Sequence, residues 1–284
     1  MTVLEVIQRS AEFLARKGVE SPRLQVELLL AHVLKLPRLE LYLNFERVLT
    51  EPELDTLRDL VKRRGRREPL QYLTGEAAFC GRDFRVTPAV LIPRPETEEL
   101  AERAGQWLEA RGTRAGVLDF GTGSGCLAVT LALRLPECPV WALDVSEAAL
   151  AVARENAARH GVTERIRFVQ GEGLGALPPE PRFAAFVANP PYIPDGDLAG
   201  LPPEVRDFEP REALAGGPDG LRFMRELAGG ADRLHPDGRL FLEFGDGQED
   251  AVAALFREAG WAIEAIERDL RGTPRILVAR PGGS

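Results

Sequence analysis

Apolar residues in the first 75 positions recur every three or four residues, the spacing of one face of an α-helix. The first such series is Leu4, Ile7, Ala11 and Leu14. A second helix is predicted to begin at Ser21-Pro22, because serine caps helices and proline is tolerated in their first turn. A third helix is predicted near residues 51–66. Residues 1–75 are therefore expected to form a small all-helical domain.

The pattern changes after residue 75. Between residues 76 and 95, apolar and polar positions alternate around Gly81 and Pro88, which predicts a hairpin linker. From residue 96 to 284, short apolar runs alternate with helical segments. The seven runs expected to form strands are 116–120, 139–143, 166–169, 183–188, 239–245, 261–266 and 275–279. This alternation predicts an α/β domain with a mostly parallel sheet, helices on both faces and one antiparallel strand at its end.

Composition and charge argue against stable nucleic acid binding and against a metal site. The formal net charge of −8 argues against a protein that holds long nucleic acid stably, because such binding needs a surplus of basic side chains. One basic run, residues 62–67, fits either a solvated helix end or a docking patch for an acidic or RNA-like partner. The three cysteines have neither disulfide nor zinc spacing, so no metal is expected.

The chain carries no apolar run of the roughly 20 residues that a membrane-spanning helix needs. Its first residues form an amphipathic pattern with acidic side chains, which differs from a signal peptide. The sequence therefore predicts a cytoplasmic protein without membrane contact.

A glycine-rich turn is expected between the first buried strand and the following helix. It comprises Asp119, Phe120, Gly121, Thr122, Gly123, Ser124 and Gly125. Glycines there let the backbone approach a ligand closely. A carboxylate at Asp119 would repel a pyrophosphate but attract an ammonium group, which favours S-adenosylmethionine over a dinucleotide. Asp144, at the end of the next strand, is positioned to accept hydrogen bonds from ribose hydroxyls.

The fourth strand of this domain ends in Asn189-Pro190-Pro191-Tyr192. The two prolines remove backbone donors and restrict φ, leaving the nearby carbonyl groups free to accept hydrogen bonds. The Asn189 side-chain oxygen and the Pro190 carbonyl could each accept one N–H of a planar –NH2 group, while the Tyr192 ring stacks against that group. Asn189, Pro190 and Tyr192 are therefore the predicted catalytic residues, and the motif predicts methylation of an amide or exocyclic amine.

The glycine turn and the Asn-Pro-Pro-Tyr motif together resemble class I methyltransferases that modify nitrogen, including adenine-N6 DNA methyltransferases and the release factor glutamine methyltransferases. Segments 68–75 and 90–98 are similar to the interdomain signatures of the second group. Further similarity lies at Phe208-Glu209-Pro210, Ala213-Leu214, Gly216-Gly217, Asp219-Gly220-Leu221, Glu243, Gly245 and Gln248. The chain thus resembles the release factor glutamine methyltransferases over nearly its whole length.

This resemblance implies a Rossmann-like class I methyltransferase with a seven-stranded sheet and a small N-terminal helical domain that helps to recognise the substrate. It implies transfer of a methyl group from S-adenosylmethionine to the glutamine of the Gly-Gly-Gln loop in class I peptide chain release factors. An adenine-N6 nucleic acid methyltransferase is the alternative. The chain departs from some relatives after its third strand, where no aromatic residue stands near the adenine position. The implied cofactor contacts are Gly121, Thr122, Gly123, Ser124, Gly125, Asp144, Glu172, Gly173 and Asn189; the implied substrate contacts are Asn189, Pro190, Pro191 and Tyr192.

Overall fold

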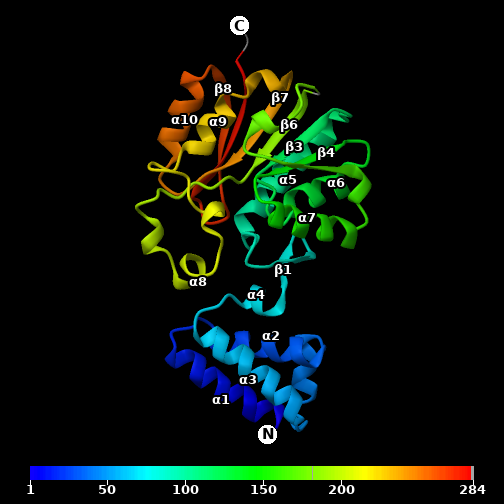
Figure 1. Ribbon diagram of the computed structural model, residues 1–284, viewed down its shortest axis with the longest axis vertical. Coiled ribbons are helices and arrows are strands. Elements are labelled where there is room, and N and C mark those ends of the chain that lie inside the picture. The colour runs from blue at the N-terminus through cyan, green and yellow to red at the C-terminus, as the bar shows by residue number, and fades with distance from the viewer. Residues whose placement is uncertain (181, 283–284) are drawn as a thin grey trace. The chain divides into compact units, whose positions relative to one another are not determined.

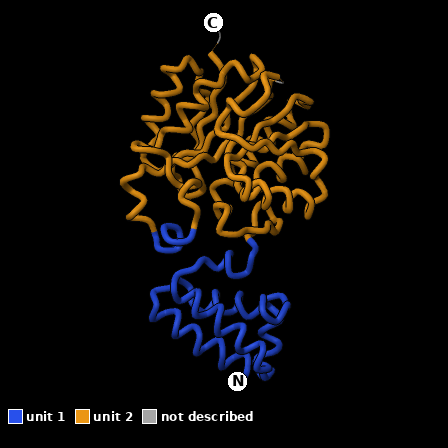
Figure 2. The backbone as a smooth tube through the Cα atoms, viewed as in Figure 1, with its two compact units in different colours: residues 1–76, 202–208 blue, residues 77–201, 209–284 orange. Residues whose placement is uncertain are grey.

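The computed structural model describes residues 1–180 and 182–282, which form two compact units. The first unit contains residues 1–76 together with 202–208, and the second contains 77–201 and the described residues from 209 onward (Figure 2). Within the described residues, no helix is both long enough and apolar enough to cross a bilayer.

The first unit is helical, as the sequence predicts (Figure 1). Its N-terminal segment contains α1 (Val3–Arg16), α2 (Pro22–Leu34), the 3-10 helix η1 (Arg38–Leu43), α3 (Glu51–Gly65) and α4 (Leu70–Thr74). A capping box begins α1, because the Thr2 hydroxyl accepts from the Glu5 amide and the Glu5 carboxylate accepts from the Thr2 amide. The second helix starts at Pro22 as predicted, but the Ser21 side chain makes no capping hydrogen bond because its backbone is left-handed.

Residues 202–208 contain the short helix α8 (Pro203–Arg206) and belong to the first unit through an ion-pair cluster. Arg64 is buried and donates to Glu204 at 2.9 Å, and Arg67 donates to both carboxylate oxygens of Glu204 at 2.6 and 2.8 Å. The basic run at the end of α3 is thus largely engaged inside this unit, since Arg63 also pairs with Glu68 at 2.6 Å.

Glu204→Gln is expected to lower the free energy of unfolding by about 2 kcal/mol, because the buried Arg64 guanidinium loses its carboxylate partner. Burial alone would raise the pKa of Glu204, but hydrogen bonds from Arg67 and Arg64 outweigh it and lower the pKa to about 2. The stabilisation is therefore present above the ordinary pKa of 4.5 and is lost as the pH falls from 4.5 towards 2.

Urea unfolding at pH 7 and pH 3 measures this effect, and Asp207→Asn is the matched control. Asp207 is exposed and pairs only with its neighbour Arg206 among the contacts described for its side chain, so its removal should leave stability unchanged. Equal stability of the Glu204→Gln variant and the wild type at pH 7 would contradict the prediction.

The second unit begins with a hairpin of β1 (Glu76–Phe79) and β2 (Arg82–Arg85), whose first residue still belongs to the first unit. A seven-stranded sheet follows, in the order β5-β4-β3-β6-β7-β9-β8. Its strands are β3 (Gly116–Phe120), β4 (Val140–Asp144), β5 (Ile166–Gln170), β6 (Phe183–Ala188), β7 (Leu234–Glu243), β8 (Trp261–Arg268) and β9 (Pro274–Pro281). Strand β9 runs antiparallel to both of its neighbours, β7 and β8, and lies between them rather than at the sheet's edge. The other pairings described in this sheet are parallel.

Helices cover both faces of the sheet (Figure 1). One face packs against α5 (Pro95–Arg111), α6 (Cys126–Arg134) and α7 (Glu147–Arg159), and the other packs against α9 (Arg222–Ala228) and α10 (Glu249–Glu258). Alternate residues of each central strand reach opposite cores, so Val117 packs with α5 and α6 while Leu118 packs with α9. The remaining 3-10 helices are η2 (Thr163–Arg165), η3 (Leu174–Ala176), η4 (Leu198–Gly200), η5 (Arg211–Ala213) and η6 (Ala231–Arg233).

Candidate active site

A cavity of about 780 Å³ lies where the carboxyl ends of β3, β4, β5 and β6 meet. Neighbouring parallel strands end at the same edge of a sheet, so residues that follow each strand converge there. Gly121 and Gly123 follow β3, Asp144 ends β4, and Asn189 follows β6. The predicted glycine turn and the Asn-Pro-Pro-Tyr motif therefore share one cavity inside the second unit.

Two glycines of the turn form a backbone cradle on the cavity wall. Gly121 and Gly123 have φ values of +75° and +53°, a conformation that favours glycine. Apart from the adjacent residues in the chain, no described atom lies within 4 Å of where a Cβ would stand at either glycine, so side chains there would fill cavity space. The turn is anchored to β4, because the Gly121 and Thr122 amides both donate to the Leu143 carbonyl at 2.9 Å.

Asp144 connects this turn to the next helix. One carboxylate oxygen accepts from the Gly123 amide and the other accepts from the Ser146 amide, both at 2.9 Å. Ser146 in turn caps α7 by accepting from the Ala149 amide at 3.2 Å. Burial raises the pKa of Asp144, while these amide donors stabilise its charged form. Asp144 lines the cavity, and a carboxylate has about four acceptor sites, so it can accept a further donor there.

Four residues that were expected to contact the cofactor lie outside the cavity lining. The buried Asp119 carboxylate accepts from the Thr122 hydroxyl at 2.6 Å and from the Ala128 amide at 3.0 Å. Burial raises the Asp119 pKa to about 7, and within the described residues its Oδ1 atom has no partner. A Cβ at Gly125 would lie 2.9 Å from the Ala153 Cβ, so this glycine serves packing between α6 and α7. The residues concerned are Asp119, Thr122, Ser124 and Gly125.

Asn189 lies on the cavity wall, and its side-chain amide has a defined orientation. Its Nδ2 atom donates to the Thr97 hydroxyl at 2.9 Å. The Thr97 hydroxyl donates in turn to a carboxylate oxygen of Glu243 at 2.8 Å. With its nitrogen held by Thr97, Asn189 has its carbonyl oxygen available to accept from a ligand.

The rest of the motif divides between the cavity and the protein interior. Pro191 lines the cavity, whereas Pro190 is buried and Tyr192 is absent from the lining. The Tyr192 ring packs against Gly245, where a Cβ would lie 3.0 Å from Cδ2, and its carbonyl accepts from Gln248 Nε2 at 2.9 Å. Burial, together with the Glu243 charge, raises the Tyr192 pKa to about 12. Tyr192 therefore anchors the motif here, which differs from the stacking position that was expected for it.

Comparisons with known proteins agree with this arrangement. Family models match the PrmC N-terminal domain at residues 5–75 and the methyltransferase small domain at residues 105–199. The release factor glutamine methyltransferase of Geobacter sulfurreducens is 45% identical over 99% of this chain and 97% of its own length. That of Nitratidesulfovibrio vulgaris is 42% identical over 98% and 95%. The chain belongs to the release factor glutamine methyltransferase family.

A solved structure supports the fold. A methyltransferase from Pyrococcus furiosus is 21% identical and covers 72% of this chain and 92% of its own, with a TM-score of 0.51. Together with the family matches, the seven-stranded sheet confirms the predicted class I methyltransferase fold with an N-terminal helical domain.

The methyltransferase cavity contains residues that sequence reasoning missed. The linker segment 88–91 and residues around 210–215 line it, as do Arg222 and Phe223. Arg222 pairs with Glu172, and Phe223 contacts Phe120 edge-on at 6.3 Å between ring centroids. Phe120 and Phe223 thus supply aromatic surface in a cavity whose lining residues after β5, at positions 171–173, include none. Arg222 and Phe223 were hard to assign from the sequence, because α9 is distant from the glycine turn along the chain.

Two segments that carried the family resemblance meet beside this cavity. Arg94, just before α5, donates to the buried Glu209 carboxylate at 2.5 Å, and the Ile92 amide donates to the same group at 3.3 Å. Burial raises the pKa of Glu209, while the Arg94 charge favours its ionised form. These hydrogen bonds connect the linker before α5 to Glu209, which lies in the segment after the Asn-Pro-Pro-Tyr motif.

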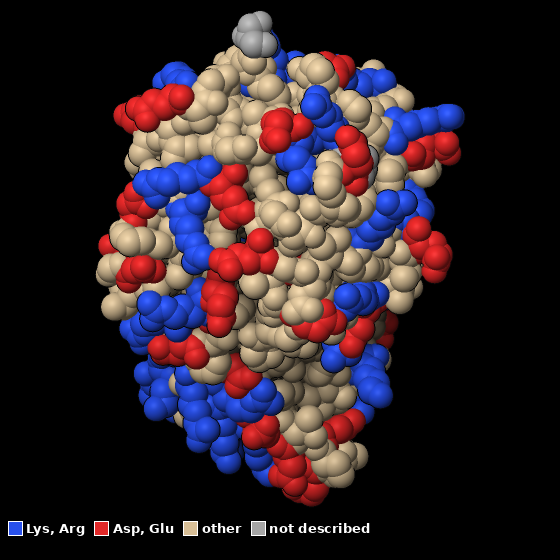
Figure 3. All heavy atoms as spheres, turned by 45° about the horizontal axis from the view of Figure 1, so that its top comes forward, with Lys and Arg blue, Asp and Glu red and all other residues tan. Residues whose placement is uncertain are grey.

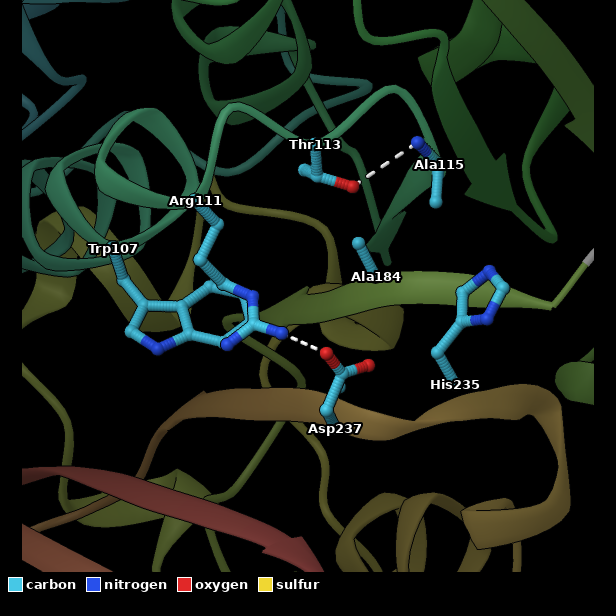
Figure 4. A pocket seen from close by; sticks show the side chains of 8 residues that line it. Trp107, Arg111, Thr113, Ala115, Ala184, His235 and Asp237 are labelled. Atoms are coloured by element: carbon cyan, nitrogen blue, oxygen red, sulfur yellow. Dashed lines mark hydrogen bonds and ion pairs between the residues drawn. The ribbon is translucent and has the colours of Figure 1, made fainter.

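A second cavity, of about 290 Å³, lies near the opposite ends of the strands (Figure 4). Ala184 lies near the start of β6 and His235 near the start of β7. In this second cavity, Arg111 forms an ion pair with Asp237, and its guanidinium carbon lies 4.8 Å from the centre of the Trp107 ring. This cavity contains none of the predicted site residues of the methyltransferase.

Gly220→Ala is expected to displace the Asn-Pro-Pro-Tyr segment and to lower stability by more than 1 kcal/mol. Gly220 has a φ of +76°, and its Cβ would stand 2.3 Å from the Tyr192 carbonyl oxygen. Gly247→Ala is the matched control, because the φ of Gly247 is +75° but no described atom beyond its chain neighbours lies within 4 Å of the added Cβ. Thermal unfolding and methylation assays should show a larger loss for Gly220→Ala; equal losses in both variants would refute the steric argument.

Proposed function

We propose that this chain transfers a methyl group from S-adenosylmethionine to the side-chain amide nitrogen N5 of the glutamine in the Gly-Gly-Gln motif of class I peptide chain release factors. The observation that carries the proposal is the oriented Asn189 amide on the cavity wall, with its nitrogen donating to Thr97 at 2.9 Å. A glutamine side chain presents two N–H donors, and the Asn189 oxygen would accept one of them. Family membership supports the substrate class.

Two features of the cavity support S-adenosylmethionine as the methyl donor. The open cradle at Gly121 and Gly123 admits close approach of the methionine portion, because side chains are absent there. Asp144 would hold the ribose, since it lines the cavity and its carboxylate can accept a hydrogen bond beyond those from the backbone. Asp119 lies outside the lining, but in its ionised form, above its pKa of about 7, it would add a negative potential suited to an ammonium or sulfonium group. When bound, this cofactor supplies an electrophilic methyl group on a positively charged sulfur.

An amide nitrogen is a poor nucleophile, because its lone pair is delocalised into the carbonyl group. The protein's contribution is therefore orientation and electrostatic stabilisation. The Asn189 oxygen, on the cavity wall, would hold the –NH2 group and stabilise the positive charge that develops on nitrogen. The carbonyl of the buried Pro190, which is outside the lining, would have to reach the cavity to act as the second acceptor. After the transfer, the substrate nitrogen would release a proton to solvent. No strong base is required.

The proposed partner is a protein, and the helical first unit would contribute to its recognition. Figure 3 shows acidic and basic side chains interspersed over most of one face, with basic ones gathered towards its lower left. The net charge of −8 does not favour a nucleic acid substrate. Methylation of a translation release factor would place the enzyme in the cytoplasm.

The test is mass analysis of a class I release factor after incubation with this protein and S-adenosylmethionine. We expect a gain of one methyl group on the peptide that contains the Gly-Gly-Gln loop. A release factor with that glutamine replaced by alanine should gain none. Methylation of an adenine-containing oligonucleotide in place of the release factor would overturn the proposal.

A further inference from the structure

Three polar side chains from three elements form a chain of hydrogen bonds behind the cavity. Glu243 ends β7, Thr97 lies in the first turn of α5, and Asn189 directly follows β6. The Glu243 and Thr97 residues are only 2% and 3% exposed, so water does not compete for their hydrogen bonds. The successive donor–acceptor distances are 2.9 Å from Asn189 to Thr97 and 2.8 Å from Thr97 to Glu243.

The chain can run in only one direction while Glu243 is ionised. A carboxylate only accepts hydrogen bonds, so the single Thr97 hydroxyl proton must point towards Glu243. Thr97 then offers only a lone pair to Asn189 and accepts from its –NH2 group. The reverse orientation of Asn189 would set its carbonyl oxygen against an oxygen that has no proton left to donate, an unsatisfied buried contact.

We propose that Glu243 and Thr97 are positioning residues that fix the Asn189 amide with its carbonyl oxygen towards the substrate. This inference rests on the proposed role of Asn189 as acceptor of a substrate N–H. It adds that the acceptor is set by a buried carboxylate two hydrogen bonds away, and that protonation of that carboxylate removes the constraint. A protonated Glu243 can donate to Thr97, which can then donate to the Asn189 oxygen and turn it from the substrate.

The surroundings of Glu243 place this change in a measurable pH range. Burial raises the Glu243 pKa to about 7, although the Thr97 hydrogen bond opposes the rise. The charges of Glu96, Arg275 and Arg94 also act on Glu243. The charge of Glu243 acts in turn on Tyr192. Glu96 raises the pKa, whereas the two arginines lower it. The methylation rate of the wild type should therefore rise as the pH increases through about 7.

Thr97→Val removes the hydroxyl while keeping the side-chain shape. We expect it to lower the single-turnover methylation rate about 10-fold, to leave cofactor affinity within about 2-fold, and to remove the rise in rate near pH 7. Thr97→Ser retains the hydroxyl and should restore both the rate and the pH profile. Thr130→Val is the matched control, because the buried Thr130 hydroxyl has no partner within the described residues.

Glu243→Gln is the second test, because a glutamine does not titrate. Its rate should be lower than that of the wild type and independent of pH from about 6 to 8, once the profile is corrected for substrate binding. A wild-type profile retained in Thr97→Val or Glu243→Gln would overturn the positioning role, whereas the absence of methylation by the wild type itself would refute the proposed function. Circular dichroism and thermal unfolding identify any variant that has lost its fold.

Discussion

Replacing Asn189 with alanine is expected to lower the single-turnover rate of methyl transfer to the release factor by about 10²-fold or more, the range for loss of one preorganised electrostatic contact. Asn189 lies on the cavity wall and its nitrogen is engaged by Thr97, so its oxygen is the group lost to the substrate. The fold should survive, because Asn189 is only partly buried and lies beyond the end of β6.

The measurement is rapid-quench transfer of labelled methyl groups with enzyme in excess. A release factor whose loop glutamine is replaced by alanine gives the background rate. Wild-type speed in Asn189→Ala would show that another group accepts the substrate amide. Transfer that persists on the glutamine-free partner would show that the acceptor atom lies elsewhere.

Asn189→Asp separates the oxygen facing the substrate from the nitrogen facing Thr97. The variant keeps an acceptor for the substrate, but its second oxygen faces a Thr97 hydroxyl whose proton is already donated to Glu243. It also adds a negative charge near a buried carboxylate. We expect a rate between those of the wild type and Asn189→Ala, with a pH profile that differs from the wild type.

The fold was predictable because most of its signals are local. Helical spacing up to residue 75 and the alternation of apolar runs with helices both depend on near neighbours in the chain. The position of β9 was less accessible, since a short link to β8 indicates antiparallel pairing but not that β9 inserts beside β7. Equally hidden was the grouping of residues 202–208 with the helical unit, which depends on Arg64 and Arg67 reaching Glu204 far along the sequence.

In the candidate site, too, local sequence signals were predictable and long-range contacts were not. Gly121, Gly123, Asp144, Glu172 and Asn189 could be placed on one cavity because each follows a parallel strand, and strand ends converge. Sequence spacing could not separate glycines that face the cavity from one that faces a helix, as at Gly125. Nor could it reveal the hydrogen bonds of Thr97 with Asn189 and Glu243, because these partners lie 92 and 146 positions away from Thr97 along the chain.

Asp144→Ala is expected to weaken S-adenosylmethionine binding by about 2–3 kcal/mol, roughly 30- to 150-fold in Kd. Two losses combine. The proposed ribose hydroxyls lose their acceptor, and the Gly123 and Ser146 amides lose theirs, each now 2.9 Å from a carboxylate oxygen. The turn that cradles the cofactor should therefore loosen as well. Isothermal titration calorimetry measures the affinity, and Glu147→Ala is the control, because Glu147 is exposed and pairs with Arg154 outside the cavity lining.

A cofactor analogue without ribose hydroxyls separates the two losses. If Asp144 holds the ribose, the analogue binds the wild type more weakly than S-adenosylmethionine does, and Asp144→Ala weakens the analogue less than it weakens the parent cofactor. If Asp144 only supports the turn, the substitution weakens both ligands equally, because both depend on the Gly121 and Gly123 cradle. Unchanged affinity for S-adenosylmethionine itself would remove Asp144 from the binding site, since neither the direct contact nor the support of the Gly123 amide would then matter.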